Sequence, residues 1–325
     1  MDWAKIMQRG RFVVVGRAGM DLYADPPGTC TEEATHFSAA LGGSSANIAV
    51  ALARLGLQSS LVTAVSDDAV GRFCRNELVR YGVDTTHVVT RAGEARTSLA
   101  VVETRAVDTQ SVIYRNNAAD FGLTEADVNI DLNGVAALIL TGTALAVDPS
   151  RVACFAIMAS ARAAGVPVVL DIDYRPYSWA TQADAAQVYA KAAAMADIVI
   201  GNDEEFGVLA GNYAAGLPLA RQLGERANGF VVYKMGPKGA VTIGPHAEFE
   251  TPVFPVTALK PTGAGDAFMG GLVAGLAQGL PLPDAVAQGA AAAAIVVTRV
   301  GCAPAMPTQA ELTEFMKAHH AHPPV

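Results

Sequence analysis

The sequence predicts an α/β protein built on a mostly parallel β-sheet that is covered by helices. From residue 135 onward, short apolar runs ending in glycine or an acidic residue alternate with helical segments, a pattern typical of buried parallel strands with crossover helices. The chain has 325 residues, 51% of them hydrophobic, and neither a long linker nor a fixed-period repeat divides it. We therefore expect one domain over residues 1–325.

The first half of the chain contributes the start of this sheet. Apolar runs at residues 12–16 and 61–65 predict two buried strands. A glycine-rich loop at 41–47 leads into apolar residues at helical spacing, and two acidic residues at 67–68 are placed to cap another helix.

A second, smaller sheet is expected outside the main one. Residues 97–103 and 110–115 alternate well enough to form two antiparallel strands of a hairpin. With part of the preceding loop they predict a lid, built from about residues 20–37 and 97–118. An exposed apolar face on such a sheet is often buried against a second copy, so we expect a homodimer formed through the lid.

The second half of the chain predicts the remaining elements of the main sheet and its cover. Helices are expected at 152–164 and 183–196 and after residues 202 and 263. The expected strands lie at residues 137–142, 168–173, 198–202 and 230–236, with short edge strands at 240–243 and 248–252.

Composition excludes several classes of partner. The net charge is −8 and no basic cluster stands out, which argues against nucleic acid and anionic membranes. The four cysteines form no CxxC pair, the N-terminus lacks the apolar core of a signal peptide, and the alanine-rich run at 285–297 is too short to span a bilayer. We expect a cytoplasmic protein with reduced thiols, and a frayed tail at 319–324 rather than a histidine metal site.

The segment Gly263-Ala264-Gly265-Asp266 is the strongest candidate for chemistry. It follows Pro261 and precedes an apolar helical run, so unshielded backbone N–H groups and the helix dipole can bind an anion, best of all a phosphate. We expect Gly263–Gly265 to form an anion hole and Asp266 to act as general base. The alternative for these residues is a helix cap after a turn.

A second group of polar residues follows the first strand. Asp21 comes just after the strand end, where ligands gather in parallel sheets, and is a candidate sugar-hydroxyl ligand or, alternatively, a turn aspartate. Gly42 and Gly43 open a helix and let a ligand touch the backbone. Asn47 would point toward the same space, the alternative being a solvated asparagine at a tight helix entry.

Together these loops resemble the ribokinase-like sugar kinases, also called the PfkB carbohydrate kinase family. The resemblance covers residue 16 to about 304 and implies a three-layer ribokinase-like fold. Four motifs in the same order carry it: Gly42-Gly43-x-x-x-Asn47, Asn202-x-x-Glu205, Lys234-Met235-Gly236-x-x-Gly239 and Gly263-Ala264-Gly265-Asp266.

The resemblance implies ATP as the phosphoryl donor, Mg²⁺ as the metal and a small sugar as the acceptor. Gly263, Ala264 and Gly265 would stabilise the transferring phosphoryl group and Asp266 would be the base. The residues implied for binding are Asp21, Gly43 and Asn47 for the sugar, Asn202, Lys234, Gly236, Gly239 and Gly265 for ATP, and Glu205 for Mg²⁺, through water.

Two segments suggest that the sugar is an acid. Residues 114–120 and 170–179 are most similar to those of family members that phosphorylate the C6 hydroxyl of 2-deoxy-5-keto-gluconate in myo-inositol breakdown. A carboxylate substrate calls for fixed cations, and we assign Arg115 and Arg175 to it. The γ-phosphate is the alternative partner of Arg175, and on position alone Arg115 could be a solvated edge-strand arginine.

The sequence departs from the family pattern at two places. Asp173 stands where relatives often have asparagine, and Lys260 stands where many have an aspartate that helps to bind K⁺. We hypothesise that the ammonium group of Lys260 replaces the monovalent cation, so that K⁺ does not activate the enzyme.

Rival functions remain open. A kinase for 2-keto-3-deoxygluconate or fructose is the nearest, although a neutral sugar would leave buried arginines unpaired. A nucleoside kinase is a weaker alternative, because an arginine-rich polar site suits an anion rather than an apolar base. A non-catalytic sensor on the same fold would be expected to lose Asp266, and the segment after Gly16 lacks the full GxGxxG entry of a dinucleotide-binding oxidoreductase.

Overall fold

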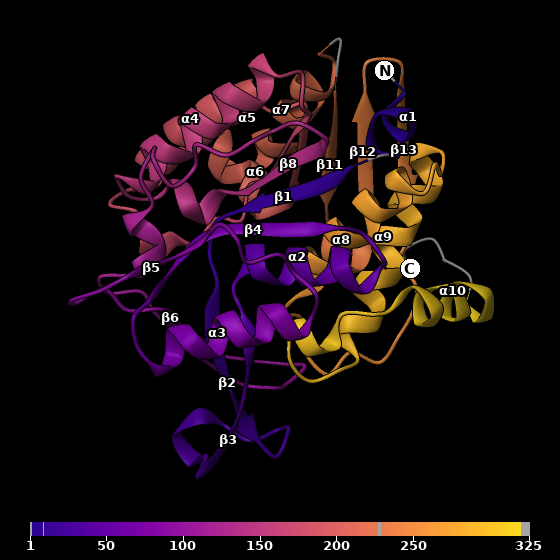
Figure 1. Ribbon diagram of the computed structural model, residues 1–325. Helices are drawn as coiled ribbons and strands as arrows, with labels where there is room; N and C mark the ends of the chain where they lie inside the picture. Colours follow the sequence, from indigo (N-terminus) through magenta and orange to yellow (C-terminus); the bar gives the residue numbers. More distant parts are fainter. Residues whose placement is uncertain (1, 9, 227–228, 320–325) are drawn as a thin grey trace.

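Strands from both halves of the chain form a nine-stranded central sheet (Figure 1). The structure, a computed structural model, describes residues 2–8, 10–226 and 229–319. The strands of this sheet are β1 (Arg11–Val15), β4 (Ser59–Ser66), β5 (Val88–Arg91), β8 (Val135–Thr141), β9 (Val168–Asp171), β10 (Ile198–Asn202), β11 (Phe230–Lys234), β12 (Ala240–Gly244) and β13 (Ala247–Thr251).

The central sheet has the order β13-β12-β11-β10-β9-β8-β1-β4-β5. Neighbouring strands from β5 to β11 pair in parallel, and only β12 and β13 form an antiparallel edge. Strands buried on both faces must be apolar throughout, which explains the continuous valine, isoleucine and leucine runs of β1 and β8.

Helices cover both faces of this sheet and so make three layers. Alternate residues of β1 point to opposite layers: Phe12 and Val14 belong to one hydrophobic core, Val13 and Val15 to the other. The first layer contains α1 (Trp3–Met7), α2 (Ser44–Arg54), α3 (Ala69–Arg80), α8 (Ala264–Ala277), α9 (Leu282–Val297) and α10 (Gln309–Ala318); the second contains α4 (Ser150–Ala163), α5 (Gln182–Met195), α6 (Asp203–Leu209) and α7 (Gly216–Gly224).

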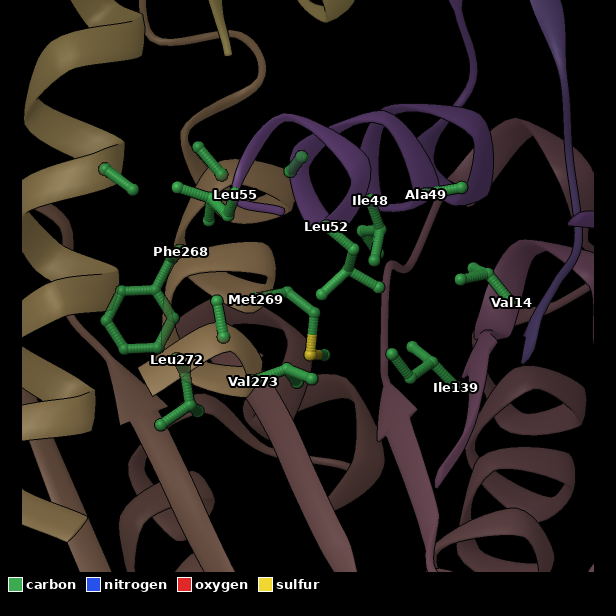
Figure 2. Packing of buried hydrophobic residues seen from close by; sticks show 14 of the residues in the cluster. Val14, Ile48, Ala49, Leu52, Leu55, Ile139, Phe268, Met269, Leu272 and Val273 are labelled. Carbon is green, nitrogen blue, oxygen red and sulfur yellow. The ribbon is translucent and has the colours of Figure 1, made fainter. Parts of the chain in front are cut away.

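Two helices far apart in the sequence, α2 and α8, pack closely in the first layer. Figure 2 shows Ile48 and Leu52 of α2 lying against Met269 and other apolar residues of α8, all of them buried. The close approach depends on Gly270, because a methyl group there would lie 2.4 Å from Cβ of Ala51. This contact sets the relative position of the two helix N-termini.

The expected small sheet is present and extends away from the central one (Figure 1). Its strands are β2 (Gly19–Asp25), β3 (His36–Gly42), β6 (Ser98–Val102) and β7 (Ser111–Tyr114), in the order β3-β2-β6-β7. One face carries a buried cluster that includes Tyr23, Val102 and Cys302. Strand β3 ends beyond the expected residue 37, at Gly42, and so leads directly into the glycine-rich loop.

The structure confirms the predicted α/β class, the mostly parallel sheet and its cover of helices. Strand β5 and helices α1, α7, α9 and α10 were not expected. Strand β5 and α1 are short, and α7 begins with a glycine, which gives no helix signal. The four cysteines are free, and no helix among the described residues is long and apolar enough to cross a membrane. The tail expected to fray, residues 319–324, lies outside the described ranges apart from His319.

Candidate active site

The N-terminus of α8 carries the segment expected to bind an anion. Its N-cap residue, Gly263, has the left-handed backbone conformation, with φ of 83°, which glycine adopts without strain. No side chain caps this helix, so the backbone N–H groups of its first turn are left for a ligand. Ala264 and Gly265 form the first turn, and a methyl group at Gly265 would lie 3.3 Å from Nζ of Lys234.

Asp266 lies in the same turn and faces α2. Its Oδ2 accepts a 2.8 Å hydrogen bond from Nδ2 of Asn47, in the first turn of α2. Asp266 remains partly exposed, as a group that meets a substrate must, but burial raises the pKa of its carboxyl to about 7. The negative charge of Asp173 also raises this pKa, whereas the bond from Asn47 lowers it.

The residues expected to hold the sugar lie around the start of α2. Asp21 is buried on β2, where Oδ2 accepts a 3.0 Å hydrogen bond from the hydroxyl of Tyr23. A methyl group at Gly42 would lie 2.1 Å from Oδ1 of Asp21, so the carboxylate packs directly against that backbone. Gly43, the N-cap of α2, has φ of 94° and is equally crowded, since a methyl group there would lie 2.5 Å from the carbonyl oxygen of Arg17.

A buried group of charges follows the ends of β9, β10 and β11. Burial raises the pKa of Asp171 to about 8 and also raises that of Glu205. Burial alone would lower the pKa of Lys234, but the carboxylates of Asp171, Glu205, Asp266 and Asp173 outweigh it and raise that pKa. Lys234 is therefore a charged ammonium between the acidic group and the N-terminus of α8.

Asn202 and Glu205 hold each other at the start of α6. Oδ1 of Asn202 accepts from the backbone N–H of Glu205 at 2.8 Å, and Oε2 of Glu205 accepts from that of Asn202 at 2.7 Å. Oε1 of Glu205 accepts from the N–H of Tyr174. Gly236 and Gly239 flank the turn between β11 and β12, which places this loop directly after Lys234.

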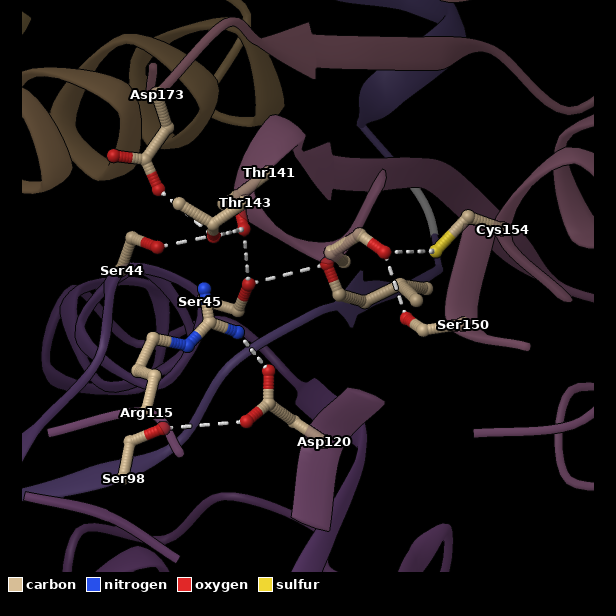
Figure 3. A network of polar contacts seen from close by, with 12 residues as sticks. Ser44, Ser45, Ser98, Arg115, Asp120, Thr141, Thr143, Ser150, Cys154 and Asp173 are labelled. Carbon is tan, nitrogen blue, oxygen red and sulfur yellow. Dashed lines mark hydrogen bonds and ion pairs between the residues drawn. The ribbon is translucent and has the colours of Figure 1, made fainter. Parts of the chain in front are cut away.

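A chain of hydroxyl groups links Asp173 to α2 and was not foreseen (Figure 3). Thr143 donates a 3.1 Å hydrogen bond to Oδ2 of Asp173, Thr141 lies 3.4 Å from Thr143, and Ser45 lies 2.7 Å from Thr141. Thr141 is the last residue of β8 and Thr143 lies in the turn that follows, at the edge of the sheet where ligands gather. That position after a strand end could have identified them from the sequence.

The two arginines assigned to a carboxylate are both held in place. Arg175 pairs with Oδ1 of Asp173 at 2.7 Å and donates to the carbonyl of Tyr174 at 2.9 Å. The side chain of Arg115 is buried and pairs with Asp120 (Figure 3). Its guanidinium also stacks over the ring of Phe121.

Lys260 is fully buried immediately before the anion-binding segment. Its Nζ donates to the carbonyl oxygens of Thr262, at 2.5 Å, and Val296, at 3.5 Å. Burial lowers the pKa of this ammonium, while Cys302, Asp266 and Asp21 raise it.

An uncapped helix N-terminus beside an aspartate and a buried lysine suits the transfer of a phosphoryl group. A family model described as pfkB family carbohydrate kinase matches residues 10–309. The chain belongs to this family.

Two relatives of this pfkB kinase are similar over nearly their whole length. The 5-dehydro-2-deoxygluconokinase of Geobacillus kaustophilus is 38% identical over 314 residues, which are 95% of this chain and 94% of the relative. The enzyme of that name from Photobacterium profundum is 41% identical over 315 residues, 94% of each chain.

Solved structures share the fold of this pfkB kinase. A fructokinase double mutant from Vibrio cholerae O395, bound to fructose, ADP and potassium ion, has a TM-score of 0.84 and 29% identity, over 94% of this chain and 98% of that one. Fructokinase from Xylella fastidiosa with bound ATP has a TM-score of 0.83 and 26% identity, over 95% and 98%.

The fold of this pfkB kinase brings together most of the residues singled out from the sequence. Asp21, Gly43 and Asn47 lie at the N-terminal end of α2, Asn47 bonds to Asp266, and the charges of Asp266 and Glu205 both act on Lys234. For Gly236 and Gly239 the structure shows only that their loop begins at Lys234.

Proposed function

We propose that this chain is an ATP-dependent kinase that phosphorylates the C6 hydroxyl of 2-deoxy-5-keto-gluconate. The observation that carries the proposal is the position of Asp266, a carboxyl with a pKa near neutrality in the first turn of an uncapped helix and beside Lys234. The names of the similar kinases supply the substrate.

In the proposed reaction, Asp266 takes the proton of the sugar hydroxyl as its oxygen attacks the γ-phosphate. Asn47 orients this carboxylate and Asp21, Gly43 and Asn47 contact the sugar. The backbone N–H groups of Gly263–Gly265 and the ammonium of Lys234 stabilise the negative charge on the transferring group. As the sugar oxygen bonds to the γ-phosphorus, the bond from that phosphorus to the β,γ-bridging oxygen breaks and ADP leaves. Asp266 holds the proton of the sugar hydroxyl and then releases it to solvent.

The residues present suit a magnesium ion held with ATP. The negative charge of Asp173 raises the pKa values of Asp171, Glu205 and Asp266, so these four carboxyl groups lie close enough to repel one another, and only Lys234 and Arg175 offset them. Among the described ranges, no group of three acidic, histidine or cysteine side chains could bind a metal directly. We propose that Glu205 and Asn202 hold Mg²⁺ through water, and that the ion shields the charge of the ATP phosphates.

The nucleotide is proposed to lie against the loop that begins at Lys234 and contains Gly236 and Gly239. Gly265 completes this side of the site, because its backbone approaches Nζ of Lys234. The acidic chain can bind ATP in this way, since helix N–H groups, Lys234 and the metal supply the positive field.

For the sugar carboxylate we propose a cationic pocket that includes Arg115 and Arg175. A neutral sugar would leave Arg115, whose side chain is 5% exposed, with buried donors that have no partner. The structural similarity to fructokinases supports a neutral ketose as the second candidate substrate.

We also propose that the ammonium of Lys260 takes the place of a monovalent cation. It is fully buried and donates to two backbone carbonyl oxygens, the type of ligand that a potassium ion uses. Its charge acts on Asp266 and Asp21. The potassium ion named with the related fructokinase is consistent with a cation being needed in this fold.

A homodimer through the lid is proposed from the outer face of the small sheet. Phe37 of β3 and Val112 and Tyr114 of β7 are 41%, 45% and 55% exposed. By the strand registers they share one face with Leu22 and Val101, so the apolar residues form one surface. Val112→Glu should convert a dimer to a monomer in sedimentation velocity, while Val79→Glu, an exposed valine on α3, should not.

The proposed reaction is tested by ATP consumption with Mg²⁺ and a panel of sugars and sugar acids. We expect strong turnover of 2-deoxy-5-keto-gluconate and little of fructose. Turnover of fructose instead would keep the kinase and discard the carboxylate pocket. A chain that bound ATP but phosphorylated no member of the panel would favour a sensor.

A further inference from the structure

Arg17 is a buried arginine that the proposed reaction has not used. It follows the end of β1 and is 6% exposed, and its Nε has no hydrogen-bond partner. Its carbonyl oxygen accepts a 3.2 Å hydrogen bond from the N–H of Ala46, and Gly43 packs against the same carbonyl. Arg17 is therefore anchored beside the loop proposed to contact the sugar.

A second arginine with a buried side chain, Arg115, lies near Arg17. Gly19, two residues after Arg17, pairs with Ser98, whose hydroxyl donates a 3.3 Å hydrogen bond to Asp120, the partner of Arg115. Nη2 of Arg115 pairs with Asp120, but Nε and Nη1 of Arg115 have no partner. Burial lowers the pKa of Arg115 and the positive charge of Arg17 lowers it further, so the two guanidinium groups repel each other. The charge of Arg17 also lowers the pKa of Asp21, one of the residues proposed to contact the sugar.

Two buried guanidinium groups close together destabilise the folded chain unless an anion binds between them. A buried guanidinium with unpaired N–H groups loses its hydration without replacement, and two such groups close together add like-charge repulsion. A carboxylate offers two oxygens that can accept from both guanidinium groups and remove both costs. Arg175 has less need of it, since Asp173 and the carbonyl of Tyr174 already accept from its guanidinium.

We propose that Arg17, together with Arg115, binds the carboxylate of the sugar acid and makes the kinase select an acid over a neutral sugar. This inference rests on the sugar-acid kinase function proposed above and adds Arg17 as its specificity-determining residue. Arg175 stays at the edge of this cationic pocket, where its guanidinium pairs with Asp173.

The test compares Arg17→Gln and Arg17→Lys with two substrates, 2-deoxy-5-keto-gluconate and its C1 primary amide, which lacks the charge. We expect Arg17→Gln to raise KM for the acid about 10- to 100-fold while kcat changes less than about threefold. KM for the amide should not rise. Arg17→Lys should raise KM for the acid less than Arg17→Gln does, because lysine keeps the positive charge but not the planar guanidinium that binds both carboxylate oxygens. Arg221→Gln, an exposed arginine paired with Glu248, is the matched control.

A binding measurement keeps the test independent of turnover. Without ATP, 2-deoxy-5-keto-gluconate should raise the melting temperature of the wild-type chain and of the control Arg221→Gln. It should not raise the melting temperature of Arg17→Gln. Without ligand, Arg17→Gln should melt no lower than the wild type, because the substitution removes an unpaired buried charge.

Two results overturn the inference and are distinguishable. If the wild type phosphorylates the acid and Arg17→Gln behaves like Arg221→Gln, or loses acid and amide in parallel, Arg17 does not bind the carboxylate and the proposed function stands. If the wild type phosphorylates fructose but neither test substrate, the proposed substrate fails and the inference fails with it.

Discussion

Asn47 and Asp266 are 219 residues apart in the sequence and are joined by a 2.8 Å hydrogen bond between the first turns of α2 and α8. The amide donates to a carboxylate whose pKa burial has raised to about 7. The bond favours the charged form of Asp266 and ties its carboxylate to the first turn of α2. The properties of the proposed base therefore depend on how these two helices pack.

Asp266→Asn should lower kcat by about 10²- to 10⁴-fold, because the amide cannot accept a proton from the sugar hydroxyl. The dissociation constant for ATP, measured by calorimetry, should change little. Asp284→Asn, an exposed aspartate in the first turn of α9, is the matched control. A kcat that stayed within tenfold of the wild type would rule out Asp266 as general base.

Asp173→Asn should move the pH dependence of kcat to lower pH. A carboxylate base works only when deprotonated, so kcat of the wild type should fall below pH about 7, the pKa of Asp266. The charge of Asp173 is, after burial, the largest contribution that raises this pKa, so its removal lowers the pKa. The pH profile of Asp184→Asn, on the exposed side of α5, should match that of the wild type.

Asn47→Ala should move the acidic limb of the pH profile, the fall of kcat below pH about 7, to higher pH. Loss of its hydrogen bond removes a contribution that lowers the pKa of Asp266, so activity at pH 6 should fall by a larger factor than activity at pH 8. Asn133→Ala, at an exposed turn, controls for the loss of a surface amide. An acidic limb that stayed in place would show that Asn47 acts on the sugar alone.

Wild-type kcat should be insensitive to K⁺ when K⁺ replaces tetramethylammonium. Lys260→Ala leaves the carbonyl oxygens of Thr262 and Val296 without this donor, and its kcat should fall at least about tenfold. K⁺ or methylammonium should restore part of the activity of Lys260→Ala. Lys317→Ala, which replaces an exposed lysine, is the control: it should keep wild-type activity, and neither ion should change that activity. Activation of the wild type by K⁺ of several-fold would contradict the proposal.

Gly270→Ala should separate α2 from α8, because the added methyl group would lie 2.4 Å from Cβ of Ala51. We expect a loss of about 1–3 kcal/mol in the free energy of unfolding, measured with urea, together with a lower kcat as the bond from Asn47 to Asp266 weakens. Adding Ala51→Gly removes the opposing methyl group and should restore kcat. No recovery in the double variant would mean that Gly270 acts in another way.

Local patterns were enough to predict much of this protein. The valine run of β1, the glycines before α2 and α8, and the strand–helix alternation after residue 135 each depend on backbone preferences and burial of neighbouring residues. For the same reason the motif at Gly263–Asp266 could be recognised, since an uncapped helix N-terminus is built from consecutive residues.

The parts that packing decides could not be predicted in this way. The hydroxyl chain from Asp173 to Ser45 joins β8, α2 and the segment after β9, and no periodicity indicates which hydroxyl meets which carboxylate. Arg17 belongs to none of the recognised motifs, and it becomes a candidate binding residue only because the fold buries it near Arg115.

By itself, the sequence determined the layers of the fold and the loops that carry the chemistry, because those follow from interactions between near neighbours along the chain. Only the tertiary structure decided the pKa of Asp266, the hydrogen-bond partner of Asn47 and the position of Arg17 near Arg115. Each of these depends on burial and on charges contributed by segments that are distant in the sequence, and such contacts exist only once the helices and sheets have packed.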